Sequence, residues 1–170
     1  MLWLNGGPGA SGIIGMLTEL GQLQTIPSPG SPTPACTRDE QPGAEASVPK
    51  LFHNKFGWTK VANLLTIEQP KGVGFSYCTG SGACKNDDIS TAQDTYEALL
   101  AFFAAYPEYK KSKFFITGES YAGVYVPMIM QQIDQKGGLP NFVGAAIGNG
   151  CWGSDCFYGV HEAQIEYAPH

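Results

Sequence analysis

A serine at position 120 follows an apolar run and precedes a helical pattern, within the stretch Phe114 to Tyr125. The aromatic and β-branched residues before it favour a strand. Gly118 and Ala122 are small enough for the strand and the helix to approach closely, and glycine tolerates strained dihedral angles. Such a strand–turn–helix presents the serine hydroxyl at the apex of the turn, where it can attack a carbonyl group. The pattern indicates a nucleophilic role for Ser120, but an ordinary turn with a buried serine would use the same residue types.

A glycine-rich loop, Asn5-Gly6-Gly7-Pro8-Gly9, follows the apolar residues Leu2-Trp3-Leu4, which are typical of the end of a buried strand. Glycine loops expose backbone N–H groups that can bind an anion. The loop does not fit the phosphate-binding pattern, because no G-K-[ST] follows it. The remaining chemical use is an oxyanion hole, in which N–H donors face the charge of a tetrahedral intermediate. A plain tight turn would also contain glycine and proline.

The segments between these motifs alternate between strand-like and helix-like patterns. Strands are predicted over Val61–Ile67 and, as a short buried strand, over Phe142–Ile147, and Ser11–Leu23 is weakly helical. A longer helix is predicted from apolar residues at helical spacing, which are Ala92, Tyr96, Leu99, Phe103 and Tyr106. Ser90 with Gln93 indicates a capping box for this helix, and Pro107 its end.

Another helix is predicted after Ser120, and Gly137-Gly138 marks its end. Pro127 lies near the first turn of this helix, where proline is tolerated.

A second glycine-rich turn, Gly72 to Tyr77, follows the predicted strand that ends at Ile67. Alternating strands and helices predict an α/β fold with a mostly parallel central sheet and flanking helices.

The composition limits the class of protein. With 170 residues the chain fits a single domain, residues 1–170, with a proline-rich surface loop at about 27–49. The net charge of −5 argues against nucleic acid as a partner, because phosphate binding needs a basic face. No apolar run is long enough for a membrane span. The first residues do not resemble a secretory signal peptide, and we interpret the chain as an internal piece of a larger protein.

Five cysteines stand at positions 36, 78, 84, 151 and 156. The near pairs Cys78/Cys84 and Cys151/Cys156 lie in glycine-rich segments, which suits local disulfides in an oxidising compartment. Zinc is the alternative for these pairs, but neither has further ligands at the usual spacing. No cofactor and no metal site is predicted.

Four motifs, in their order and spacing, resemble the serine carboxypeptidase family. They are Leu2-Trp3-Leu4-Asn5-Gly6-Gly7-Pro8-Gly9, Gln69-Pro70 with Gly72-Val73-Gly74-Phe75-Ser76-Tyr77, Gly118-Glu119-Ser120-Tyr121-Ala122-Gly123 with Tyr125-Val126-Pro127, and Ile147-Gly148-Asn149-Gly150. The resemblance covers nearly the whole chain apart from the proline-rich loop and the cysteine-bearing loops. It implies a partial α/β-hydrolase fold and hydrolysis of the C-terminal peptide bond of a peptide.

The resemblance also implies a role for individual residues. Ser120 would be the nucleophile, and the backbone N–H groups of Gly7 and Tyr121 would form the oxyanion hole. The free C-terminal carboxylate of a peptide substrate would be held by Asn5, Glu119 and the N–H of Gly6, with Glu19 as a supporting acid. A glutamic acid can hold a carboxylate only when the two groups share a proton, so substrate binding is expected to weaken as Glu119 loses its proton. An acidic, lysosome-like or vacuole-like compartment, or the extracellular space, would suit this chemistry.

The chain departs from the family in its general base. The family's Asp and His lie far downstream of the serine, and only 50 residues follow Ser120. His161 and His170 are not in segments that resemble the family's histidine motif, and His53 precedes the serine. Ala10 also stands where the family usually has a cysteine. The expected Asp and His therefore lie outside this chain, and its activity as it stands is left open.

Two alternatives remain beside a carboxypeptidase. Acyltransferases of the same family tend to have aspartate where Glu119 stands and to lack the asparagine matched by Asn5, so both residues favour the peptidase. The other alternative is a truncated, non-catalytic member of the family that serves as a binding or regulatory module.

Overall fold

The computed structural model describes residues 1–25, 51–79, 84–151 and 153. These residues belong to two compact units, one formed by Met1–Ile13 and Leu65–His170 and the other by Ile14–Leu64. The proline-rich loop predicted at about 27–49 lies outside the described residues, and so does most of the stretch after Gly150.

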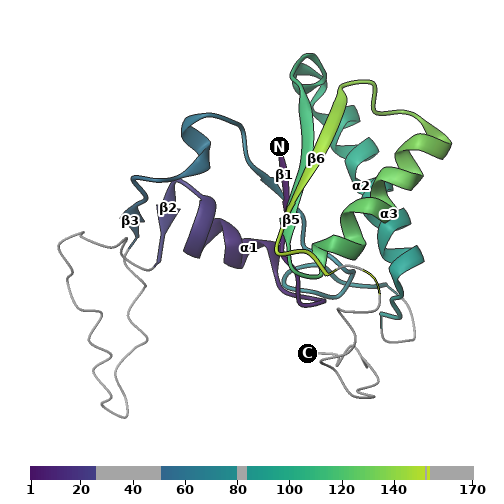
Figure 1. The fold of residues 1–170 in the computed structure, drawn as a ribbon, viewed down its shortest axis with the longest axis horizontal. Coiled ribbons are helices and arrows are strands. Elements are labelled where there is room, and N and C mark those ends of the chain that lie inside the picture. The colour runs from purple at the N-terminus through teal and green to yellow at the C-terminus, as the bar shows by residue number, and fades with distance from the viewer. Residues whose placement is uncertain (26–50, 80–83, 152, 154–170) are drawn as a thin grey trace, which may run out of the picture. The chain divides into compact units, whose positions relative to one another are not determined.

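The first unit is built on a four-stranded parallel sheet. Its strands are β1 (Leu2–Leu4), β4 (Leu65–Thr66), β5 (Phe114–Glu119) and β6 (Phe142–Gly148), in the order β4-β1-β5-β6 (Figure 1). Leu2, Trp3 and Leu4 of β1 are buried, and so are Phe114 and Ile116 of β5, as expected for parallel strands covered by helices. Phe115 of β5 is 39% exposed. Because all four strands are parallel, their carboxyl ends meet at one edge of the sheet, and β1 and β5 end there with Leu4 opposite Gly118.

Two helices lie side by side on one face of this sheet (Figure 1). They are α2 (Asp88–Ala105) and α3 (Ala122–Lys136), and a short 3₁₀ helix, η3 (Pro107–Lys111), follows α2. The core between the helices and the sheet contains Leu4, Leu99, Ile116 and Ile129, each at most 1% exposed. This confirms the predicted parallel sheet with flanking helices. Of the apolar residues at helical spacing in α2, four are buried, which are Ala92, Tyr96, Leu99 and Phe103, whereas Tyr106 at the end of the helix is 50% exposed.

The predicted cap of α2 is wrong by one turn. The helix begins at Asp88 with Asp87 as its N-cap, and Ser90 occupies the third helical position of the capping box. The Asp87 carboxylate accepts from the Ser90 N–H at 2.6 Å, while the Ser90 hydroxyl accepts from the Asp87 N–H at 3.0 Å. Either residue type can cap a helix, and the reciprocal pair formed here satisfies two N–H groups at once.

Three further predictions about elements need correction. Of the strand predicted over Val61–Ile67, only Leu65–Thr66 pairs with β1, and Val61 is 89% exposed. Strand β6 is present as predicted but is only partly buried, because it is an edge strand in the described sheet. Pro127 lies inside α3, in its second turn rather than its first.

The second unit is small. Its described elements are the π-helix η1 (Met16–Leu20), which follows the short helix α1 (Gly12–Gly15), then β2 (Leu23–Gln24), β3 (Phe52–His53) and the 3₁₀ helix η2 (Trp58–Lys60). Strands β2 and β3 pair antiparallel. The buried Asn54 donates to the carbonyl oxygens of Glu19 and Gly21 at 2.9 and 3.0 Å, which fixes the end of η1. Across the described ranges, no helix has both the length and the apolar character that a bilayer crossing requires.

Candidate active site

Ser120 lies in a sharp turn between β5 and α3, with a backbone φ of 56°. This left-handed conformation is uncommon for a residue with a side chain, and such conformations gather at functional sites. Three main-chain hydrogen bonds hold the turn. The Ser120 N–H donates to the Gly148 carbonyl at 3.1 Å, and the Ser120 carbonyl accepts from the N–H groups of Gly123 and Cys151 at 2.9 and 2.8 Å. The side chain of Ser120 remains exposed.

The small residues around Ser120 are required by close packing. A Cβ on Gly118 would lie 2.5 Å from the Cβ of Ala122 and 2.5 Å from the Leu4 carbonyl oxygen. A Cβ on Gly123 would lie 2.5 Å from the N and O atoms of Cys151. The predicted reason for Gly118 and Ala122, a close approach of strand and helix, is therefore confirmed.

The glycine loop after β1 lies directly against Ser120. A Cβ on Gly6 would lie 2.6 Å from Ser120 Cβ and 2.9 Å from Ser120 Oγ. Gly7 and Gly9 have φ values of 115° and 89°, which favour glycine, and the Gly7–Pro8 peptide bond is cis. The Ala10 N–H donates to the Gly6 carbonyl at 3.1 Å and closes the loop.

Tyr121 follows the serine and directly precedes the first residue of α3. Its backbone nitrogen would lie 2.8 Å from a Cβ on Gly6, so this amide also borders the glycine loop. The N-terminus of a helix carries partial positive charge, which favours an anion there. The Tyr121 side chain is buried, and its hydroxyl donates to Asp88 Oδ1 at 3.0 Å.

Asn5 and Glu119 are neighbours across the strands. The register pairs Leu4 of β1 with Gly118 of β5, so the next residues along each chain, Asn5 and Glu119, take adjacent positions at the end of the sheet. Trp3 Nε1 donates to Asn5 Oδ1 at 2.9 Å, and Asn5 is 7% exposed. The Asn5 amide oxygen is thus the acceptor for Trp3, and the NH₂ group is the donor end of the same side chain.

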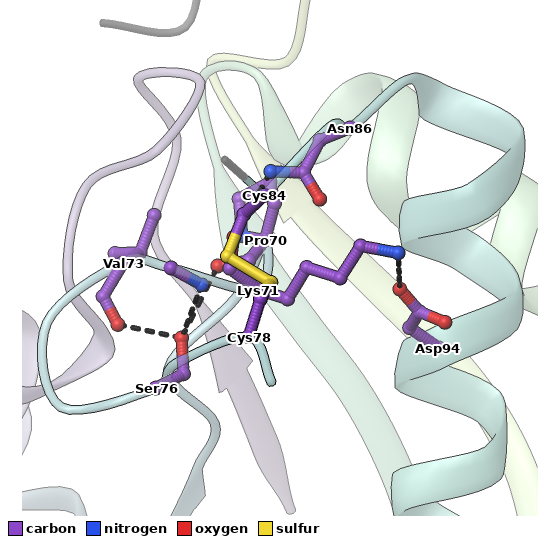
Figure 2. Close-up of a disulfide and its surroundings, with 9 residues drawn as sticks. Pro70, Lys71, Val73, Ser76, Cys78, Cys84, Asn86 and Asp94 are labelled. Atoms are coloured by element: carbon purple, nitrogen blue, oxygen red, sulfur yellow. Dashed lines mark hydrogen bonds and ion pairs between the residues drawn. A yellow bond between two sulfur atoms is a disulfide. The ribbon is translucent and has the colours of Figure 1, made fainter. Parts of the chain in front are cut away.

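The second glycine-rich turn, Gly72 to Tyr77, is fastened by a disulfide between Cys78 and Cys84 (Figure 2). Ser76 Oγ accepts from the Gly72 N–H at 2.8 Å. Asn86 Nδ2 donates to the Lys71 carbonyl at 3.0 Å, and Lys71 Nζ pairs with Asp94 of α2 at 3.0 Å.

The Cys78–Cys84 disulfide predicted from the sequence is confirmed, and it uses both sulfur atoms. Cys151 is also disulfide-bonded, while the partner predicted for it, Cys156, lies outside the described residues.

The remaining residues singled out from the sequence are Glu19 and the histidines, and none of them belongs to the described part of the first unit. Glu19 lies exposed in η1 and His53 lies exposed in β3, both in the second unit. The histidines at 161 and 170 lie outside the described residues. The place of Glu19 beside a bound carboxylate therefore stays a prediction.

Sequence reasoning missed two residues that form hydrogen bonds with residues of the site. Trp3 orients Asn5, and Tyr125 contacts the glycine loop. A tryptophan two residues before an asparagine on a strand places both on one face, which is a signal for the first of these contacts. Spacing gives no signal for the second, because its partners are 116 residues apart.

Comparisons with known proteins agree on one family. Residues 1–163 match the family model described as serine carboxypeptidase. The lysosomal protective protein of Mus musculus is 41% identical over 88% of this chain and 27% of its own length. Serine carboxypeptidase-like 47 of Arabidopsis thaliana is 36% identical over 95% of this chain and 29% of its own length.

A solved structure shares the fold. A prohormone-processing carboxypeptidase from Saccharomyces cerevisiae matches 89% of this chain and 30% of its own, with 29% identity and a TM-score of 0.67. This match confirms the predicted partial α/β-hydrolase fold. The chain spans less than a third of the length of each of these relatives.

Proposed function

The chain belongs to the serine carboxypeptidase family, and we propose from this premise that it forms the nucleophile-bearing part of a serine-type carboxypeptidase. The substrate is a peptide with a free C-terminal carboxylate, and the bond cleaved is the last peptide bond. The observation that carries this proposal is the contact between Gly6 and Ser120, because it places the Ser120 hydroxyl next to the backbone amides of the glycine loop.

In the proposed reaction, Ser120 Oγ attacks the carbonyl carbon of the last peptide bond and gives its proton to a general base. The N–H groups of Gly7 and Tyr121 stabilise the negative charge that develops on the carbonyl oxygen. The C-terminal amino acid leaves with a proton from the same base, and an acyl-enzyme on Ser120 remains. Water then hydrolyses the acyl-enzyme. The base is a histidine supported by an aspartate, supplied by residues beyond those described.

The substrate's terminal carboxylate is proposed to bind at the end of β1 and β5. The Asn5 amide, oriented by Trp3, and the N–H of Gly6 donate to it, and Glu119 shares a proton with it. Glu19 supports this proton sharing. Binding then requires one proton on the pair of carboxyl groups, which favours an acidic secretory compartment such as a lysosome or vacuole.

A fluorophosphonate probe tests the nucleophile. We expect the chain, extended by the downstream segment of its own transcript, to be labelled at Ser120, and we expect no labelling of the Ser120→Ala variant. If the folded, extended chain is not labelled, the proposal is wrong and the non-catalytic alternative holds.

The carboxylate site is tested with a pair of peptides that differ only at the C-terminus. A peptide with a free carboxylate should be cleaved much faster than its C-terminal amide. In Glu119→Gln, the increase of KM toward neutral pH should be smaller than in the wild type, because the shared proton is no longer needed. A wild-type pH profile in this variant would contradict the proton-sharing account.

A further inference from the structure

We infer that Tyr125 is a positioning residue that holds the glycine loop in the geometry of an oxyanion hole; the inference rests on the function proposed above. Its hydroxyl oxygen accepts a hydrogen bond from the backbone N–H of Gly9 at 3.2 Å. Gly9 is the last residue of the glycine-rich loop that begins at Asn5, so the bond fixes the C-terminal end of the loop. No sequence motif assigns a role to this hydroxyl.

The tyrosine itself is rigidly held. Tyr125 is 1% exposed, and its ring packs edge-to-face on the ring of Tyr121 with 5.1 Å between the centroids. A fully buried aromatic ring with a packed neighbour keeps one rotamer, so its hydroxyl has a fixed position. The Gly9 amide is therefore bound to an acceptor that does not move with the loop.

The loop needs such an acceptor because its own backbone is permissive. Gly7 and Gly9 both adopt left-handed φ values, and glycine has more accessible conformations than any other residue. The bond from Ala10 to the Gly6 carbonyl closes the loop but does not fix it to the rest of the unit. The bond to Tyr125 does, because Tyr125 belongs to α3.

As a consequence, helix α3 fixes the positions of both backbone N–H groups that are proposed to form the oxyanion hole. The Tyr121 amide stands at the start of α3, and the Gly7 amide is held, through Gly9, by a side chain one turn further along α3. The two amides then keep a constant separation, which preorganised charge stabilisation requires.

Tyr125→Phe tests this directly, because it keeps the ring and removes the hydroxyl that accepts from Gly9. We expect the backbone amide of Gly9 to exchange with deuterium at least about tenfold faster in the variant, since it loses its hydrogen-bond partner. Tyr96→Phe is the matched control. It removes the hydroxyl of another buried tyrosine, which donates to the Gly137 carbonyl at 3.0 Å. This hydrogen bond does not involve the glycine loop, so the exchange rate of the Gly9 amide should not change.

The kinetic readout separates positioning from general stability. In the extended chain, Tyr125→Phe should lower kcat and the rate of fluorophosphonate labelling by roughly 10-fold to 100-fold, with KM unchanged, as expected for donors displaced by a fraction of an ångström. Tyr96→Phe should change neither rate by more than about twofold.

Each outcome decides the inference. Unchanged Gly9 exchange in Tyr125→Phe would overturn it, and so would faster exchange with wild-type kcat and labelling. A wild-type chain that is never labelled at Ser120 refutes the proposed function instead. In that case the exchange experiment still decides whether Tyr125 holds the loop.

Discussion

Gly6→Ala is the most direct perturbation of the site, because the structure gives the clash that it creates. The new methyl group would lie 2.6 Å from Ser120 Cβ, 2.8 Å from the Tyr121 nitrogen and 2.9 Å from Ser120 Oγ. Carbon atoms pack at about 3.5–4.0 Å, so the loop and the turn must separate by roughly 1 Å. Two of the three atoms met belong to the backbone or to Cβ, and a rotamer change cannot move them.

Two effects of known size follow from this separation. Forcing a methyl group into a packed site costs about 1–3 kcal/mol of folding free energy. For a chain of this length, each kcal/mol lowers the melting temperature by roughly 2–4 °C. A displacement of about 1 Å at a catalytic centre costs on the order of 10²-fold in rate, so labelling of Ser120 should slow by about that factor.

The assay is thermal denaturation together with the rate of fluorophosphonate labelling. Gly144→Ala in β6 is the matched control, because a Cβ there meets no atom within 4 Å and should leave both quantities near their wild-type values. If Gly6→Ala keeps the wild-type melting temperature and labelling rate while Gly144→Ala does too, the contact between the glycine loop and Ser120 does not exist in solution.

Three further outcomes are expected. Trp3→Phe removes the donor to Asn5, which is worth about 1 kcal/mol, so KM for a free-carboxylate peptide should rise several-fold with little change in kcat; an equal effect on a C-terminal amide would contradict this. Cys78→Ser with Cys84→Ser opens a loop with a sequence separation of 6 and should lower the free energy of unfolding by about 2 kcal/mol, measured by urea denaturation; an unchanged midpoint would refute it. Donation from the backbone N–H of Ser90, and then from its side chain, lowers the pKa of Asp87 below its ordinary value of 3.8. The stability from the ionised group is therefore present above pH 3.8 and is lost as the pH falls through the lowered pKa, so Asp87→Asn should be less stable than the wild type at pH 7 and nearly equal to it at strongly acidic pH.

Local patterns predicted the parts of the site that depend on neighbouring residues. The run Phe114 to Tyr125 contains its own strand, turn and helix, and the glycines at 6, 7 and 118 occupy places where the backbone needs them. The alternation of strand-like and helix-like segments was also sufficient to predict a parallel sheet with flanking helices, because this alternation is typical of α/β folds.

The remaining features depend on contacts that spacing does not encode. The Gly9 amide meets Tyr125 across 116 residues, and no local pattern links the two. The apolar residues from Val61 onward look like a strand, but only Leu65 and Thr66 reach a partner strand, so tertiary pairing decided the element. Asp87 and Ser90 are both good caps, and the sequence does not rank a reciprocal pair above a single one.

The bend at residue 120 is held through its own amide and carbonyl, which reach Gly148, Gly123 and Cys151, and none of these contacts uses the hydroxyl. The chemistry of this position is therefore separable from its shape. Cysteine there would install a sulfur nucleophile on an unchanged scaffold, and alanine would give an inert form suited to capturing intact peptides for crystallography.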